Sequence, residues 1–203
     1  MRLMDMSADT EPAAPPAPGE EQYPALALVN STVALTGGRF ADRLGTPAGA
    51  DRWLAEHGLA PADAGLQESC SGRLRSLREQ VRALLAARVA ALPAPPAALS
   101  AVNDALTRAP AAPLLRWDED GGFSRATPHP TDRILDHALA ALAADAADLL
   151  TGADAARLTA CGSAPCTRYL LRHGRRHWCS TRCGDRARAA RAYARRTRPT
   201  TAG

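Results

Sequence analysis

Lysine is absent from this 203-residue sequence: all 25 of its basic residues are arginine. Aromatic residues make up only 4% of the chain, so a hydrophobic core has to be built mainly from Leu, Val and Ala. Long apolar runs are missing too. The longest uncharged stretch, residues 22–38, contains Asn, Ser, Thr and paired Gly, and it is too short and too polar to span a bilayer. The first residues lack the apolar segment of a signal peptide, so we expect a cytoplasmic protein.

Acidic residues are nearly absent from the last quarter of the chain. Residues 1–156 hold 13 Arg and 20 Asp or Glu, whereas residues 157–203 hold 12 Arg and only one acid, Asp185. A GC-rich genome would favour Arg over Lys, but that bias does not remove acids from one segment. A mildly acidic body with a strongly basic tail is typical of a protein whose C-terminal part binds a polyanion.

Four of the five cysteines lie within 23 residues and form two pairs, Cys161 with Cys166 and Cys179 with Cys183. In a reducing compartment, pairs at this spacing indicate a zinc site rather than disulfides. Four thiolates enclose Zn²⁺ tetrahedrally and leave no open position for catalysis, so we predict a structural zinc site. The metal is expected to supply folding energy that so short a segment cannot obtain from a core of its own.

The remaining candidate ligands are weaker. His173 and His177 lie between the cysteine pairs, but four thiolates already satisfy the ion. Cys70 occupies an apolar position in a helical pattern, and we expect it to be a small buried residue.

The chain before the cysteines is expected to form a mainly α-helical body with one small β-hairpin, over residues 23–152. Residues 1–22, rich in Pro, Ala and acids, are expected to be disordered. Apolar residues recur at steps of three and four over residues 66–92, which predicts a long helix. Four arginines fall between the apolar positions of that helix and are interpreted as a solvated face: Arg73, Arg75, Arg78 and Arg82.

Shorter elements surround the long helix. Further helices are predicted over residues 26–35, from a Thr46 cap to Gly58, around inward-facing Leu99, Val102 and Leu106, and from a Thr131 cap to Gly152. Residues 114–117 and 123–126, joined across residues 120–122, predict the hairpin. The sequence of the body shows no group of residues typical of a catalytic site. It contains no phosphate-binding Gly loop, and its histidines are isolated: His57, His129 and His137. We therefore expect no enzyme activity.

The cysteine-rich segment, residues 157–198, is expected to be a treble-clef-like or ribbon-like finger made of a hairpin and a terminal helix. The hairpin is predicted to join residues 169–171 to residues 177–178 through a turn at Gly174, with Trp178 as a lid over the metal. Ser180 is a good N-cap for a helix over residues 181–196.

This terminal helix carries an unusual charge pattern. At 100° per residue, the small residues of this helix form one stripe: Cys183, Ala187, Ala190 and Ala194. We expect this stripe to lie against the first cysteine pair and the body. Arginines flank the stripe on both sides, and the planar guanidinium group binds two phosphate oxygens at once. A merely solvated helix would normally interleave acids, so we favour polyanion binding.

The same residues carry a family resemblance. Residues 161–166 (CGSAPC) and 175–186 (RRHWCSTRCGDR) resemble the CGNR zinc finger, which is named for its Cys-Gly-Asn-Arg motif. Residues 26–31, the helix with Trp53 and Leu54, the Arg-rich helix and residues 146–150 are similar to the ABATE domain of stress-induced transcriptional regulators. The resemblance covers nearly all of the chain after the N-terminal segment.

What the resemblance implies is a zinc-dependent, DNA-binding transcriptional regulator whose body senses an effector or contacts a protein partner. The predicted duplex-DNA contacts are Arg172, Arg175, Arg176, Arg182, Arg186, Arg188, Arg191 and Arg195. One residue departs from the family motif, because Asp185 replaces its Asn and an ionised carboxylate cannot donate a hydrogen bond, so base preference does not carry over. The alternative is an interaction module for RNA or an acidic protein, and oxidation of the cysteines would make the regulator a redox sensor.

Overall fold

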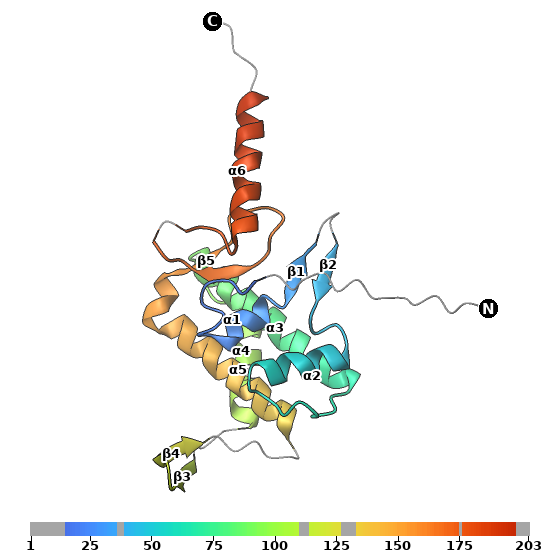
Figure 1. The fold of residues 1–203 in the computed structure, drawn as a ribbon, viewed down its shortest axis with the longest axis vertical. Helices are drawn as coiled ribbons and strands as arrows, with labels where there is room; N and C mark the ends of the chain where they lie inside the picture. Colours follow the sequence, from blue (N-terminus) through green and yellow to red (C-terminus); the bar gives the residue numbers. More distant parts are fainter. Residues whose placement is uncertain (1–14, 36–38, 110–113, 127–132, 175, 198–203) are drawn as a thin grey trace, which may run out of the picture.

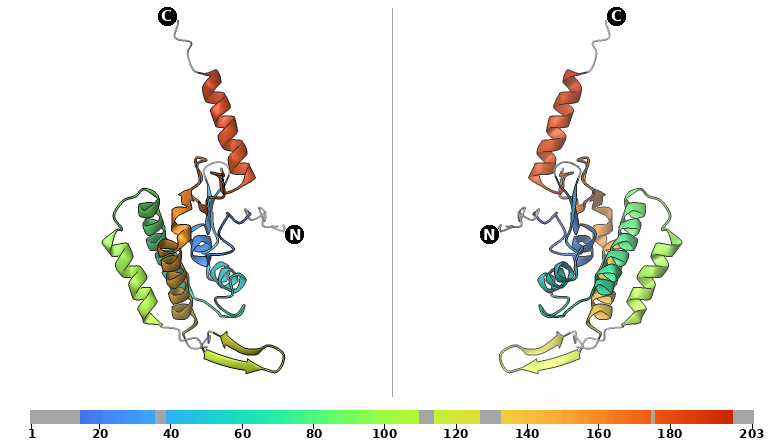
Figure 2. Two further views of the ribbon diagram at one scale, coloured as in Figure 1. Left: turned by 90° about the vertical axis from the view of Figure 1, so that its left-hand side faces the viewer. Right: turned by 90° about the vertical axis from the view of Figure 1, so that its right-hand side faces the viewer.

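The computed structural model describes residues 15–35, 39–109, 114–126, 133–174 and 176–197. A helical body occupies the middle of the molecule, helix α6 projects from one end, and the β3–β4 hairpin projects near the other (Figure 1, Figure 2). The predicted fold class is therefore confirmed. Among the described residues, no helix is long and apolar enough to cross a membrane.

The helices of the body pack around an aliphatic core. They are α1 (Pro24–Val29), α2 (Pro47–Glu56), α3 (Glu68–Val89), α4 (Pro96–Arg108) and α5 (Ile134–Thr151). Leucines from α1, α3 and α5 are fully buried together with Trp53, the largest core side chain. Cys70 is half-buried against this core and lies apart from the other cysteines.

Three antiparallel strand pairs complete the fold. They are β1 (Thr32–Ala34) with β2 (Phe40–Asp42), β3 (Leu114–Asp118) with β4 (Gly122–Ala126), and β5 (Leu158–Ala160) with β6 (Tyr169–Leu171). A 3₁₀ turn, η2 (Ala153–Ala156), links α5 to β5. Leu158 and Leu171 are buried in the core of the body, so the β5–β6 pair belongs to its packing.

Several predicted elements are confirmed. Thr46 caps α2 by accepting a hydrogen bond from the Gly49 amide (3.1 Å), and Gly58 follows the helix with a φ of +65°. Helix α5 ends before Gly152, while its predicted cap, Thr131, lies outside the described residues.

Two helix predictions were wrong in part. The helix expected over residues 26–35 ends at Val29, and Thr32–Ala34 form a strand instead. The side chain of Asn30 is hydrogen-bonded to the backbone of Tyr169, and the β-branched residues Thr32 and Val33 favour an extended chain. In α4, Leu99 is 47% exposed, and Ala98 is buried beside Val102.

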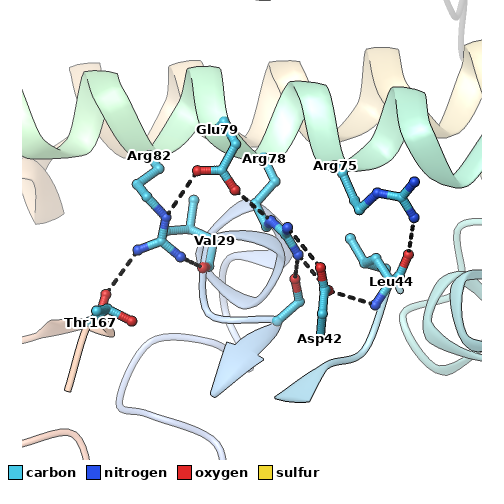
Figure 3. Close-up of polar contacts among 9 residues, drawn as sticks. Val29, Asp42, Leu44, Arg75, Arg78, Glu79, Arg82 and Thr167 are labelled. Carbon is cyan, nitrogen blue, oxygen red and sulfur yellow. Dashed lines mark hydrogen bonds and ion pairs between the residues drawn. The ribbon is translucent and has the colours of Figure 1, made fainter. Parts of the chain in front are cut away.

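The predicted solvated face of the long helix was wrong for Arg78 and Arg82. Arg78 on α3 is only 6% exposed, and its guanidinium donates to the Ser31 hydroxyl (3.0 Å). It also donates to both carboxylate oxygens of Asp42 (2.6 and 2.9 Å), as Figure 3 shows. Arg82 reaches the backbone carbonyls of Val29 and Thr167. The helical period locates these arginines beside the apolar stripe, but it does not reveal the acceptors that distant segments bring there.

The structure describes residues 15–22 of the N-terminal segment that we expected to be disordered, and they are packed against the rest of the protein. Residues 1–14 lie outside the described part, but residues 15–22 contact the body and the cysteine-rich segment. Ala17 is 2% exposed, and the Leu171 amide donates to the carbonyl of Pro18 (2.8 Å).

Candidate metal centre and basic helix

The structure brings four cysteines together at the foot of α6 (Thr181–Arg196). Their Sγ atoms all lie within 4.8 Å of one another, with Cys166 and Cys179 at 3.6 Å and Cys179 and Cys183 at 3.5 Å. Cys161, Cys179 and Cys183 are buried and Cys166 is half-buried. The sequence prediction of one four-cysteine cluster matches this geometry.

Local backbone structure places each cysteine pair. The first pair lies in the loop between β5 and β6, where the Cys161 amide donates to the Arg168 carbonyl (2.8 Å) and the Cys166 amide to the Ser163 carbonyl (2.8 Å). In the second pair, Cys183 lies in the first turn of α6, because the Ser180 hydroxyl caps that helix by accepting from the Cys183 amide (3.2 Å). The Gly162 amide joins the two parts by donating to the His177 carbonyl (3.0 Å).

The predicted hairpin within this segment was wrong in its pairing. Strand β6 pairs with β5, across the first cysteine pair, and residues 177–178 form no strand. The turn at Gly174 does occur, with a φ of +55° that favours glycine. Apolar residues on both sides of Gly174 suggested a local hairpin, but β6 pairs instead with the more distant Leu158–Ala160.

The donor set fits a divalent cation. Hydrogen bonds from the Cys166 and Cys179 thiols and from the Cys179 and Ser163 amides lower the pKa of Cys161 to about 2. The same thiolate raises the pKa of Cys166 to about 11, and it raises the pKa of Cys179 as well. Four thiolates this close repel one another unless a cation neutralises them, and four-thiolate tetrahedral shells are characteristic of structural Zn²⁺. Both histidines near the cluster, His173 and His177, are exposed and outside it.

Trp178 packs beside the cluster and under the basic helix. Its ring is half-buried against the cysteines, and the guanidinium carbons of Arg188 and Arg191 lie 5.9 and 5.5 Å from the ring centroid. Gly184 allows this approach, because a Cβ there would lie 3.3 Å from the Trp178 ring. The ring thus couples the metal cluster to the first turns of α6.

Helix α6 leaves the rest of the protein after its first turns. Cys183 and Gly184 are buried, but Ala190 and Ala194 are exposed, so the predicted small-residue stripe does not lie against the body. Figures 1 and 2 show the helix standing out from the body. A short stripe of alanines offers little apolar area, and the surrounding arginines favour solvent.

The arginines predicted to contact DNA fall into distinct environments. Arg172, Arg182 and Arg195 are exposed, and Arg186 is half-exposed. Arg176 braces the second cysteine pair by donating to the carbonyls of Trp178 (3.0 Å) and Cys179 (3.3 Å).

The remaining predicted arginines are Arg175, Arg188 and Arg191, and two of them already have partners within α6. Arg188 is paired with Asp185, Arg191 donates to the Ala187 carbonyl (3.2 Å), and Arg175 lies outside the described residues. Arg186 and Arg191 border a groove of about 460 Å³ between α6 and the first cysteine pair, which is also lined by Ser163, His177 and Trp178.

Sequence reasoning missed the residues that attach this segment to the body. Asn30 imitates a β-partner of Tyr169, since its side chain donates to that residue's carbonyl and accepts from its amide, both at 2.8 Å. Arg168, 5% exposed, donates to the Glu20 carboxylate (2.6 Å) and to the Pro15 carbonyl (2.9 Å). The sequence offered one signal for this contact: Glu20 belongs to an acidic N-terminal segment, and Arg168 belongs to a segment that has almost no acids of its own.

Comparison with known proteins places these features in families. Residues 22–153 match the ABATE family, described as "Putative stress-induced transcription regulator", and residues 157–196 match the CGNR zinc finger. No curated protein matches the chain. The ABATE match covers more than half of the sequence and the CGNR match contains all four clustered cysteines. The chain therefore belongs to the ABATE family and carries a CGNR zinc finger that follows its ABATE domain.

Proposed function

We propose that this protein is a cytoplasmic transcriptional regulator whose zinc finger binds duplex DNA through helix α6. The observation that carries the proposal is the position of α6: it is anchored at the cysteine cluster by its first turn, and most of its later residues are exposed. Its charged residues are arginines apart from Asp185, and that acid is already paired with Arg188. A projecting helix with this charge is suited to a phosphate backbone.

Zinc has a structural role in this proposal. Bound by the four cysteines, Zn²⁺ would neutralise their thiolates and keep the two cysteine pairs together. Ser180, Arg176 and Trp178 then fix the direction in which α6 leaves the finger. No catalytic step is involved, because a shell of four cysteines has no open position.

The arginines of the finger are proposed to have different roles in DNA binding. Exposed Arg172, Arg182 and Arg195 would contact phosphates, together with Arg175, Arg188 and Arg191. Arg186, which borders the groove, would contact either a phosphate or a base edge, whereas Arg176 would mainly brace the second cysteine pair.

We also propose residues 23–152 and 157–198 as the two units of the chain. They are not independent in packing, because Leu158 and Leu171 enter the core of the body and Asn30 holds Tyr169. Metal removal should therefore unfold the finger and lower the melting temperature of the body, without abolishing its helical structure.

A variant series tests DNA binding through α6. Arg195→Ala should weaken binding to every duplex, while Arg88→Ala, an exposed arginine on helix α3, is the matched control and should leave affinity unchanged. Arg186→Ala should in addition alter sequence preference if the side chain contacts a base, where a bidentate contact is worth about 1–3 kcal/mol. Equal weakening by both single variants at positions 88 and 195 would contradict the proposal. Tighter binding of single-stranded RNA or of an acidic peptide than of duplex DNA would favour the alternative interaction module.

A further inference from the structure

The β3–β4 hairpin exposes an apolar face that the zinc finger does not use. Leu115 is 70% exposed, Trp117 65% and Phe123 72%. Side chains alternate across a strand, and Leu115 pairs with Arg125 and Trp117 with Phe123, so these four residues share one face. The Trp117 and Phe123 rings contact each other edge to face, with centroids 4.9 Å apart.

A two-stranded hairpin with so many exposed apolar side chains is expected to be more stable when another surface packs against it. Within the described residues, β3 and β4 pair only with each other, which leaves two open strand edges. Isolated two-stranded hairpins are marginally stable in water, and clustered exposed apolar side chains usually mark an interaction site. The pictures show the hairpin extending from the body near the start of α5 (Figure 1, Figure 2).

The charges on the hairpin are self-complementary. Its turn carries Glu119 and Asp120, whereas Arg125 lies toward the other end, opposite Leu115. A two-fold axis through the Trp117–Phe123 pair would place the acidic turn of one hairpin over Arg125 of a second. The same operation would stack the two aromatic pairs at the centre. A parallel arrangement would instead bring like charges together.

We propose that this face is a self-association surface, and that its occupant is the same hairpin of a second copy of the chain, packed face to face and antiparallel. Such an interface is isologous, so each copy contributes both the acidic turn and Arg125. Helix α6 lies at the far end of the molecule from the hairpin, and the dimer leaves it accessible (Figure 1). This inference does not depend on DNA binding.

The first test is the oligomeric state of the zinc-loaded full chain, measured by sedimentation velocity over a range of concentrations. The wild type should show a reversible monomer–dimer equilibrium. The Trp117→Ser/Phe123→Ser variant should raise the dimer dissociation constant at least about tenfold, because it removes the central aromatic contacts. Circular dichroism and zinc content should not change, since the hairpin lies outside the body core. A wild type that stays monomeric, or a double variant that dimerises like it, would overturn the proposal.

Charge reversal tests the antiparallel arrangement and does not require removal of any apolar residue. Arg125→Glu alone should weaken the dimer, and so should Glu119→Arg/Asp120→Arg alone. All three changes in one chain restore opposite charges across the two-fold axis and should recover the dimer. If the triple variant is as weak as either parent, the antiparallel pairing is wrong. If none of these variants alters dimerisation, another surface mediates it.

Discussion

Replacing Arg78 with Ala removes the buried cation that connects α3 to the β1–β2 hairpin. The Arg78 side chain is 7% exposed and that of its partner Asp42 is 28% exposed. Deleting one member of a buried ion pair costs about 3–5 kcal/mol, because the other charge loses its compensation. Since Asp42 retains some access to water, we expect the lower end of that range, about 3 kcal/mol. In a protein of this size that corresponds to a fall in melting temperature of about 6–12 °C.

The pH dependence of this loss has a definite sign. Burial opposes ionisation of Asp42, but hydrogen bonds from Arg78 and from the Leu44 amide outweigh it and hold the pKa of Asp42 below its ordinary value. The ionised pair therefore stabilises the fold at neutral pH. Its contribution is lost as the pH falls below the ordinary range of Asp and through the lowered pKa. The difference between wild type and Arg78→Ala should be largest at pH 7 and should shrink toward pH 3.

Urea unfolding followed by circular dichroism measures both quantities. Arg88→Ala, on the exposed side of the same helix, is the control and should change the free energy of unfolding by at most about 0.5 kcal/mol. Arg78→Lys should fall between the two, because an ammonium group cannot bind both carboxylate oxygens of Asp42 in the same way. If Arg78→Ala costs no more than Arg88→Ala, Arg78 is solvated and the structural account of this face is wrong.

Three further predictions concern the metal cluster and the body. Elemental analysis should find about one zinc per chain in the wild type and in Cys70→Ser, but a large loss in Cys179→Ser; retention in the latter would exclude Cys179 as a ligand. Gly184→Val should shift the emission of Trp178 and weaken zinc binding, since a Cβ at this position already lies 3.3 Å from the ring; an unchanged spectrum would contradict that packing. Burial raises the pKa of Asp145 to about 6, so the folded protein holds a proton that the unfolded chain loses above about pH 4, and stability should fall as the pH rises between these values. Asp145→Asn keeps an acceptor for the α1 amide and should abolish this fall, with a gain at pH 7 of about 1–3 kcal/mol, since each pKa unit is worth about 1.4 kcal/mol; a wild-type stability that rises over the same pH window would refute the assignment.

The metal cluster was predictable from the sequence because its information is local. The spacing within each cysteine pair is set by one loop and one helix turn, and Ser180 marks where that helix begins. The long helix and the Thr46 cap were predictable for the same reason. Each depends on residues within a few positions of one another.

The attachment of the finger to the body was not predictable, because it depends on contacts between distant segments. Asn30 and Tyr169 are far apart in the sequence, and the helical period gives no indication that an Asn side chain will replace a β-partner. The same holds for Arg78, whose place beside an apolar stripe is consistent with either a solvated or a buried guanidinium. Only the position of Asp42 decides between them.

The most direct measurement of the central claim is the salt dependence of duplex binding by the zinc-loaded chain. A labelled duplex is titrated at several salt concentrations with the wild type and with Arg195→Ala. If about six arginines of the finger neutralise phosphates, log affinity should fall against log salt concentration with a slope near −5, and the variant should flatten it by about one unit. A flat salt dependence, or a slope that Arg195→Ala leaves unchanged, would show that α6 is not the DNA-binding surface.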